Sequence, residues 1–372
     1  MTDSTLPPPG VDPALSAEPI IGFGSPVQQL MLYGGRLYRN YALRAAFQAI
    51  ITIWAVLTFT FVLVRLLPGS PVDVFIDRQM QTSGMSYDQA LARASSIFGT
   101  DFQRPLLEQY LAYVNNILHG NMGTSITSTG TPVLDIVKAY LPWTLFSVGL
   151  GLLISFIVGL ALGMLMAYWR NSLFDTVATT IASFLGSVPS YLLAILIVYF
   201  FGVQLKVFSV AAARGAYSPG MTPGFTLDFF LDVLSHATLP IITYLISNFG
   251  NWALTMKNST LGVLGEEYVT AAQARGLGQW RILTAYVGRN AALPLFTQLA
   301  LSIGFVIGGS TIIEQYFLYP GVGYKLITAI RDRDYTVMQG IFLVITVAVI
   351  VANLMTDFLY SRLDPRVRLS KG

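Results

Sequence analysis

The sequence predicts an all-α integral membrane protein with six transmembrane helices. Of its 372 residues, 54% are hydrophobic and only 11% are charged, whereas about 25% of the residues of a typical soluble protein are charged. Six uncharged, mainly apolar runs each contain the roughly 20 residues that a helix needs to cross the hydrocarbon core. These runs lack the alternation of apolar and polar residues that a membrane β-barrel requires, so the expected spans are helices.

The expected spans begin at residue 45. Residues 109–134 are also uncharged, but asparagines, a histidine and a Ser/Thr/Gly series make them polar, which places them outside the bilayer. The six expected spans are residues 45–66, 139–169, 176–205, 233–256, 290–313 and 335–358. Residues 68–138 form a large external segment between the first two spans, and residues 206–232 form a shorter one.

Basic residues predict the orientation of the chain. They gather before the first span, in the turn after the second, in the loop between the fourth and fifth, and after the sixth. These residues are Arg36, Arg39 and Arg44, then Arg170, then Lys257, Arg275, Arg281 and Arg289, and finally Arg362, Arg366, Arg368 and Lys371. With six spans, all four groups fall on one side. Cytoplasmic loops carry an excess of Lys and Arg, so this side, with both termini, is expected to be cytoplasmic.

The first 36 residues are expected to form a flexible cytoplasmic tail. Residues 1–35 are rich in Pro, Gly and Ser and contain no Lys or Arg. A secretory signal has a basic start and an apolar core, so this stretch does not predict one. The Pro7–Gly10 string (PPPG) indicates extended or disordered chain.

The loop at residues 258–289 is expected to form a helix, a glycine turn and a second helix at the membrane surface. Alanines over residues 267–275 favour helix, and glutamates at its start suit the positive end of the helix dipole. Gly276 and Gly278 are then expected to end this helix, and residues 279–290 to form the second. Composition alone also allows an ordinary basic cytoplasmic loop.

Five residues in or beside the spans are candidates for a transport pathway, and each has a plainer alternative. Pro189 and Pro240 each remove a backbone hydrogen bond and permit a kink; kinked helices line transport paths, but a proline in a span can equally be tolerated packing. Asn248 and Asn251 are expected to face protein or an aqueous cavity. Glu314 ends the fifth span, where a solvated boundary charge is the simpler interpretation and a place near the pathway the alternative.

No catalytic or metal site is predicted. The chain contains no cysteine, which excludes disulfides and thiolate chemistry, and His119 and His236 are too few and too separated for a metal site. No phosphate-binding G-x-x-x-x-G-K-[ST] string occurs, so the chain is not itself an ATPase. The net charge of +3 is explained by a basic membrane face without any nucleic acid.

Several separated motifs, in the right order, resemble the permease subunits of ABC importers. Residues 270–276 (TAAQARG), with residues 290–294 (NAALP) downstream, resemble the EAA loop of this family. Tyr268–Val269 in front and Arg289–Asn290 behind resemble the dipeptide, oligopeptide and nickel branch. Thr270 stands where the general motif has a glutamate, a departure that this branch commonly shows.

Four further strings carry the same resemblance, which covers residues 37–369. Two of them, residues 65–71 (RLLPGSP) and 120–125 (GNMGTS), resemble the first of the two paired permeases. The others are residues 314–323 (EQYFLYPGVG) and 363–368 (LDPRVR), which resemble the segment after the fifth span and the C-terminal signature of the family. The resemblance implies the six-helix fold of a type I importer permease in a bacterial or archaeal plasma (inner) membrane.

The resemblance also implies a coupling helix and a set of partners. The residues implied to couple to an ATPase are Glu267, Tyr268, Thr270, Ala271, Ala272, Arg275 and Gly276. The partners are a second homologous permease, two ATP-binding subunits that hold ATP and Mg, and an extracytoplasmic solute-binding protein that docks on the external loops. The chain itself is expected to bind no cofactor and to catalyse no reaction.

Substrate and mechanism leave alternatives. Peptides are the usual cargo of this branch, while close relatives carry oligosaccharides or nickel. A secondary transporter or channel would need ionisable residues within the spans for ion coupling, and apart from His236 near a boundary the six runs hold none away from their ends. A structural membrane scaffold is a third possibility, which co-purification with an ATPase would exclude.

Overall fold

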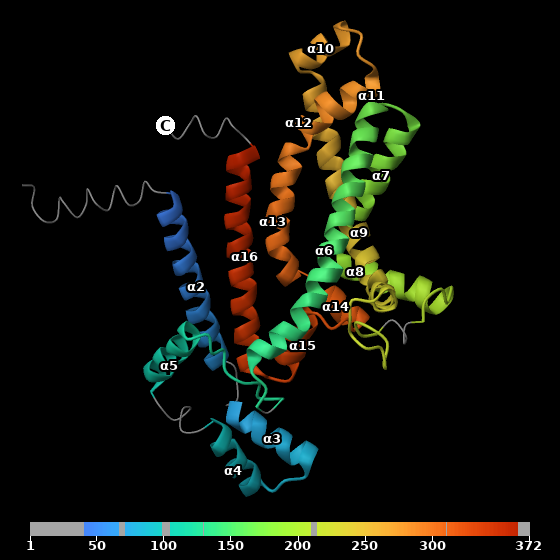
Figure 1. Ribbon diagram of the computed structural model, residues 1–372. Coiled ribbons are helices and arrows are strands. Elements are labelled where there is room, and N and C mark those ends of the chain that lie inside the picture. The colour runs from blue at the N-terminus through green and yellow to red at the C-terminus, as the bar shows by residue number, and fades with distance from the viewer. Residues whose placement is uncertain are drawn as a thin grey trace, which may run out of the picture. The chain divides into compact units, whose positions relative to one another are not determined.

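The computed structural model describes residues 41–66, 71–98, 105–128, 130–209, 214–309 and 311–363. The regular elements within these ranges are helices, apart from one isolated β-bridge between Thr124 and Pro132 (Figure 1). The chain divides into two units, residues 1–50 and 51–372. The described part of the first unit is the beginning of helix α2 (Tyr41–Leu66). The expected N-terminal tail, most of the 65–71 string and the C-terminal signature lie outside the described residues.

Four described helices are long and apolar enough to cross a membrane. They are α2, α6 (Val133–Tyr168), α9 (Leu227–Leu264) and α16 (Tyr335–Leu363). These helices contain the predicted first, second, fourth and sixth spans. α9 stays uninterrupted through Pro240, so this proline does not break the helix.

The predicted third span is two helices that meet at a sharp bend. α7 (Leu173–Ser187) and α8 (Ser190–Ile197), which continues as the π-helical segment η2 (Val198–Gln204), are inclined by 100° to each other. Val188 has an extended backbone, with φ −81° and ψ 125°, because the ring of the following Pro189 disfavours a helical conformation there. Counted as one broken span, this pair raises the described candidate spans to five.

The predicted fifth span is not one helix. Residues 290–313 are divided among α12 (Arg289–Ala291), α13 (Leu293–Gly309) and α14 (Thr311–Phe317). α13 has 17 residues, which is shorter than the roughly 20 of an ordinary span. The predicted count of six is therefore not reached by single helices among the described residues.

Small residues allow α6 and α9 to pack closely side by side (Figure 1). Every fourth residue of one α6 face is small and buried: Ser147, Gly151, Ser155, Gly159, Gly163 and Ala167. A Cβ on Gly151 would lie 2.6 Å from Tyr244 Cβ, and one on Gly163 would lie 2.6 Å from Met256 Cβ. Close backbone approach through small residues is typical of helix pairs in membranes.

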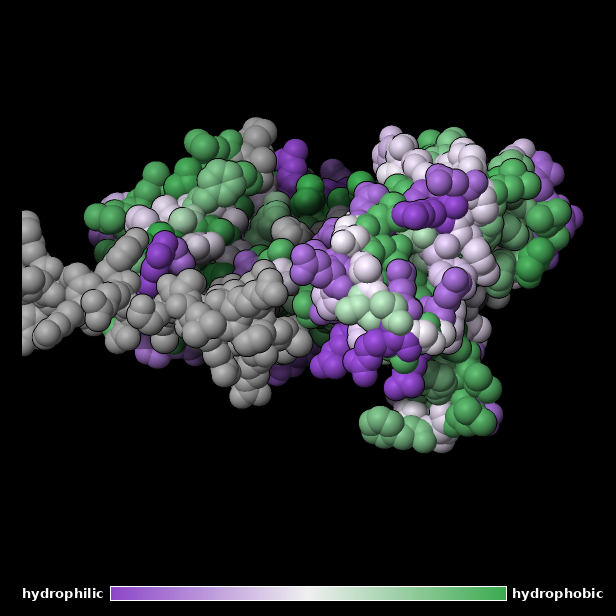
Figure 2. Space-filling view, turned by 90° about the horizontal axis from the view of Figure 1, so that it is seen from above, coloured by the Kyte–Doolittle hydropathy of each residue, from purple (hydrophilic) through white to green (hydrophobic). Residues whose placement is uncertain are grey.

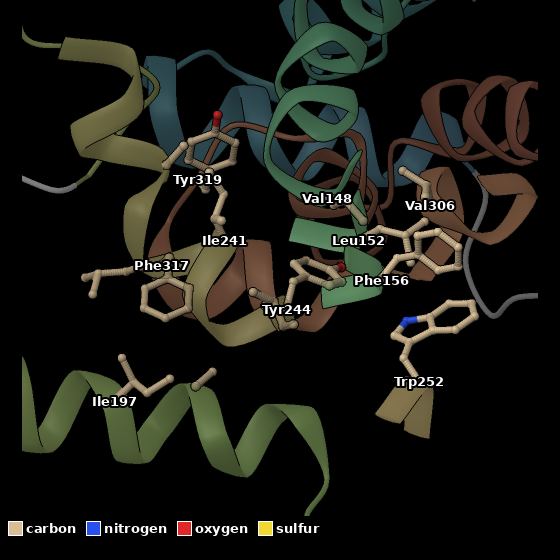
Figure 3. Close-up of a cluster of buried hydrophobic side chains, with 14 of the residues drawn as sticks. Val148, Leu152, Phe156, Ile197, Ile241, Tyr244, Trp252, Val306, Phe317 and Tyr319 are labelled. Carbon is tan, nitrogen blue, oxygen red and sulfur yellow. The ribbon is translucent and has the colours of Figure 1, made fainter. Parts of the chain in front are cut away.

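A hydrophobic cluster extends from this helix pair to α8, α13 and α14 (Figure 3). Phe156 of α6 meets Trp252 of α9 edge to face, with ring centroids 5.2 Å apart. The other labelled members are Val148, Leu152, Ile197, Ile241, Tyr244, Val306, Phe317 and Tyr319. The two long helices are thus the core around which the broken elements pack.

The segment between α2 and α6 contains three helices, α3 (Pro71–Ser83), α4 (Tyr87–Phe98) and α5 (Leu106–Leu118). Residues 87–97 and 106–117 have helical spacing in the sequence, and α4 and α5 lie there. α3 begins at Pro71, because proline is tolerated in the first turn of a helix, where its missing N–H would have no partner anyway.

A second hydrophobic cluster joins this segment to the C-terminal part of the chain. Phe75 of α3 and Ala94 of α4 pack in one cluster with Leu326 of α15 (Val322–Arg331) and Ile341 of α16. The start of α6 contributes to the same cluster through Val133. The segment between α2 and α6 is therefore packed on α15, α16 and the start of α6.

Candidate functional site

The loop expected at residues 258–289 forms the predicted helix, turn and second helix. α10 (Glu267–Ala274) is followed by α11 (Gln279–Arg281) and the π-helical η3 (Ile282–Gly288). Gly276 has φ +74°, a left-handed conformation that favours glycine and ends α10. Gly278 has φ −60° and caps α11, so its backbone conformation does not require glycine. Of the two predicted helix-ending glycines, Gly276 is the one that turns the chain.

α10 has a buried face and an exposed face. Val269 and Ala272 are buried and pack against Ile282 and Val287 of η3. The other implied coupling residues are exposed: Glu267, Tyr268, Thr270, Ala271, Arg275 and Gly276. Ala272 thus supports the helix from inside instead of lying on its outer surface. Seen from the end that carries α10 and α11, hydrophilic residues gather over this part of the molecule (Figure 2).

Side-chain hydrogen bonds join parts of this loop to one another and attach it to α6 and α9. Within the loop, the Asn290 amide donates to the Tyr268 hydroxyl at 2.9 Å. The Tyr168 hydroxyl at the end of α6 donates to Gln279 Oε1 at 2.9 Å. On the other side, Ser259 Oγ of α9 donates to the carbonyl of Ala291 at 2.7 Å. The loop and the residues that follow it are therefore bonded to both α6 and α9.

An ion pair links α7 to α9 near the same end. Lys257 Nζ lies 2.6 Å from Asp175 Oδ1 and also donates to Thr179 Oγ1 at 2.9 Å. Asp175 in turn accepts the backbone N–H of Asn171 at 3.2 Å, closing the turn between α6 and α7. Lys257 was counted among the basic residues of the loop, but it lies within α9 and its charge is paired inside the protein.

Four of the five pathway candidates lie within α9 or at the bend before α8. Asn248 Nδ2 donates to the carbonyl of Tyr244 on its own helix at 2.9 Å. Asn251 is exposed. A Cβ added to Gly186 of α7 would lie 3.1 Å from Asn251 Oδ1. Pro240 is buried within α9, and Pro189 precedes the first residue of α8.

Glu314, the fifth candidate, is fully buried at 0% exposure, and its interpretation as a solvated boundary charge is wrong. Its carboxylate accepts hydrogen bonds from Thr144 Oγ1 of α6 at 2.8 Å and from the N–H of Tyr324 at 3.0 Å. The latter N–H belongs to the first turn of α15, so Glu314 caps that helix at its positive end. The Glu314 carboxylate fills the space beside Gly321. A side chain at position 321 would overlap the carboxylate, since an added Cβ would clash with its atoms.

The phenol of Tyr319 lies in the same region. Burial, and next the nearby carboxylate of Glu314, raise the pKa of Tyr319 above its ordinary value. The phenol is therefore neutral at physiological pH and adds no second negative charge beside Glu314.

Sequence reasoning missed a second buried carboxylate, Asp334, which is 1% exposed. It accepts hydrogen bonds from the hydroxyls of Ser125 at 2.5 Å and Thr127 at 2.9 Å, and from the N–H groups of Ile126, Thr127 and Val337 at 3.1–3.3 Å. Asp334 thus caps α16 and holds residues 125–127 against its start. The available signal was an aspartate directly before a long apolar helix, a preferred N-cap position.

Metal-binding geometry is not found among the described residues. No group of three His, Cys, Asp or Glu side chains in the described ranges lies close enough to hold an ion. The ring of His236 is buried, with Nδ1 2.9 Å from the carbonyl of Asp232, and that of His119 is 2.8 Å from the carbonyl of Asn115.

Several apolar helices of membrane-spanning length, with a polar helix–turn–helix at one end, indicate a multi-pass membrane protein. Residues 159–369, more than half of the chain, match the family described as binding-protein-dependent transport system inner membrane component. The chain belongs to this family and is a membrane component of an ABC transport system.

Similar proteins match along nearly their whole length. A protein from Brucella suis biovar 1 that carries the name of a peptide permease is 34% identical over 83% of this chain and 93% of its own. The di/tripeptide transport system permease protein DppB of Pseudomonas aeruginosa is 33% identical over 85% and 95%. The oligopeptide transport system permease protein AppB of Bacillus subtilis is 28% identical over 88% and 98%.

Proposed function

We propose that the chain is one of two paired permease subunits of an ATP-driven, binding-protein-dependent importer of peptides. The observation that carries this proposal is the similarity to three permeases named for peptides, di/tripeptides and oligopeptides over at least 83% of the chain. The same machinery carrying oligosaccharides or nickel complexes is the alternative. In either case the chain is a non-catalytic subunit in the plasma (inner) membrane of a bacterium or archaeon.

In this proposal the chain crosses the membrane six times. The bent pair α7–α8 forms the third crossing, and α13 with α14 forms the fifth. Both termini and residues 258–289 are cytoplasmic, and residues 68–138 are external. The exposed side chains of Arg275, Arg281 and Arg289 support this orientation.

The hydrogen bonds of the buried Glu314 carboxylate, and not its burial, favour an ATP-driven mechanism over an ion-coupled transporter. Such a transporter needs an ionisable group that exchanges its ion or proton during the cycle. Glu314 instead accepts hydrogen bonds from Thr144 and from the first turn of α15, which makes it part of the scaffold. An ATP-driven mechanism needs no such group in this chain.

The exposed face of α10 is the proposed contact with an ATP-binding subunit. Two such subunits hold ATP and Mg, and their closure displaces α10. The bonds from Ser259 and Tyr168 then carry that displacement to α9 and α6. The loop makes the arrangement of the helices and that of the ATPases depend on each other, which is a coupling free energy between two sites.

The external helices are the proposed docking face for an extracytoplasmic solute-binding protein. α3 and α4 pack on α15 and α16 through one hydrophobic cluster, and Asp334 fixes residues 125–127 to the start of α16. A protein that docks on this segment can therefore act on α16 directly.

Cysteine cross-linking to the ATP-binding subunit tests the coupling role of α10. Because the chain has no cysteine, each variant carries a single thiol. Thr270→Cys, on the exposed face, should cross-link to a cysteine in the partner's surface, with an efficiency that changes when ATP binds. Ala272→Cys is the matched control on the buried face of the same helix and should cross-link far less. Equal cross-linking at both positions, or none in an assembled complex, would contradict the proposal.

Topology and substrate need separate measurements. Arg281→Cys should react with an impermeant maleimide in inside-out vesicles and stay unlabelled in intact cells. Proteoliposomes that contain the whole transporter and its binding protein should transport labelled di- to oligopeptides when ATP is supplied. The ATP must be present on the side of the membrane where the ATP-binding subunits lie. Uptake of nickel or oligosaccharides without uptake of peptides would assign the alternative cargo.

A further inference from the structure

A polar pocket of about 510 Å³ lies between the coupling loop and the ends of α6 and α9. Tyr168 and Arg170 line it from the end of α6 and the α6–α7 turn, while Gln273 and Gln279 line it from α10 and α11. Its apolar wall includes Ile282 of η3. The pocket thus joins residues of the coupling loop to residues about 100 positions earlier in the chain.

The pocket is suited to an anion. Arg170 is the one charged residue among those that line it. Within the described part of the chain this arginine is exposed and has no ion-pair partner, whereas Lys257 nearby is paired with Asp175. The Tyr168 hydroxyl donates a hydrogen bond to Oε1 of Gln279. The amide N–H groups of Gln279 therefore remain as donors for a ligand in the pocket. A guanidinium with neutral amide donors beside it is a favourable partner for a carboxylate.

The turn that carries Arg170 is held in place before any partner binds. Asn171 adopts a left-handed backbone with φ +63°. Ser172 Oγ accepts the N–H of Asp175 at 3.1 Å, and Asp175 accepts the N–H of Asn171 at 3.2 Å. The ion pair of Asp175 with Lys257 then fixes the turn to α9. Binding at a turn that is already ordered costs less conformational entropy.

We propose that this pocket receives an acidic side chain of the ATP-binding subunit, which forms an ion pair with Arg170 and a second contact beside α10. The inference rests on the proposed function of the chain as an importer permease. A protein carboxylate is favoured over a lipid headgroup, because Gln273 and Gln279 belong to the same loop whose exposed face is the proposed ATPase contact. Through both contacts, the ATP-binding subunit holds the α6–α7 turn together with α10.

Photo-cross-linking in the assembled transporter tests this inference. A benzoylphenylalanine at position 170 should form an adduct with the ATP-binding subunit, and mass spectrometry should place it next to an Asp or Glu. Thr270→Cys serves as the internal reference. A cross-link from Thr270→Cys with no protein adduct at position 170, or with a lipid adduct alone, would overturn the inference and leave the proposed function standing. Loss of both cross-links would contradict the proposed function as well.

Charge reversal provides a second readout that does not depend on one variant. Arg170→Glu should weaken the retention of the ATP-binding subunit by about tenfold or more, whereas Arg170→Lys should keep most of it. Arg281→Glu, a reversal at another exposed arginine that does not line the pocket, should have a much smaller effect. Replacing the cross-linked acid by Lys should restore binding to Arg170→Glu, and failure of that rescue would argue against a direct ion pair. If Arg170→Glu does not accumulate, the cross-link at position 170 and the retention measured with Arg170→Lys still test the ion pair.

Discussion

A close contact between α6 and α9 predicts that two neighbouring glycines respond oppositely to the same substitution. Gly151 faces α9, where an added Cβ would lie 2.6 Å from Tyr244 Cβ and 3.3 Å from the carbonyl oxygen of Ile241. Gly149, two residues earlier on the same helix, has no described atom within 4 Å of its added Cβ. Alanine at either position has the same intrinsic effect on the helix, so the difference between the two variants reports on the interface alone.

The magnitudes follow from these distances. Carbon atoms pack at about 3.5–4.0 Å, so α6 and α9 would have to separate locally by about 1 Å to admit the methyl group of Gly151→Ala. Overpacking of this kind costs about 1–3 kcal/mol. Replacing a glycine within a helix by alanine contributes about 0.5–1 kcal/mol in the other direction. Gly151→Ala should therefore have a net cost of up to about 2.5 kcal/mol and Gly149→Ala a gain of about 0.5–1 kcal/mol, so the two variants should differ by about 1–3 kcal/mol.

Thermal unfolding of the purified transporter, followed by intrinsic tryptophan fluorescence, measures this difference. Trp252 of α9 lies in the affected cluster, so the signal reports on the relevant packing. We expect a lower Tm for Gly151→Ala and an equal or higher Tm for Gly149→Ala, in the same detergent. Equal Tm values for the two variants would refute the conclusion that close approach at Gly151 determines the packing of α6 on α9.

Three further matched predictions concern turns and caps, all measured by Tm of the purified transporter. Gly276→Ala should cost about 1–2 kcal/mol, because alanine is strained at φ +74°, while Gly278→Ala at φ −60° should stay within about 0.5 kcal/mol; equal effects would contradict the proposed turn. Asp334→Ala should destabilise by more than about 3 kcal/mol by leaving several buried donors unpaired and should make residues 124–131 sensitive to protease. Its control, Asp332→Ala, removes a half-exposed pair at 3.9 Å and should change little, so similar losses in both would argue against the cap. Glu314→Ala should cost about 2–5 kcal/mol through two orphaned donors, and an unchanged Tm would show that the cap on α15 is dispensable.

Much of the helical framework could be predicted from local sequence, because length and hydropathy determine whether a segment can cross a membrane. The helix and turn at residues 267–276 could also be predicted, since alanines, early glutamates and Gly276 define a short helix and its end. The buried position of Ala272 had a signal as well: it lies three residues after Val269, on the same helix face. That periodicity assigns both residues to the packing face of α10.

Other features depend on partners that are distant in the sequence. Pro189 marks where the third span breaks, but the angle of 100° depends on how α7 and α8 pack afterwards. The burial of Glu314 depends on the return of the chain at Gly321, which places the start of α15 over the carboxylate. A carboxylate at the end of an apolar run carries no local signal that distinguishes a solvated charge from a buried cap.

The two buried carboxylates also constrain the order in which the protein is built. Glu314 meets Thr144 across 170 positions, and Asp334 meets Ser125 across 209. At about 5–20 residues per second, synthesis of these intervals takes roughly 10–40 s. During that time Thr144 and Ser125 are already synthesised, but Glu314 and Asp334, which accept their hydrogen bonds, are not. The unit can close only after its C-terminal quarter has been synthesised, so a nascent chain that stops before Asp334 keeps those donors unpaired and is a natural target for membrane proteases.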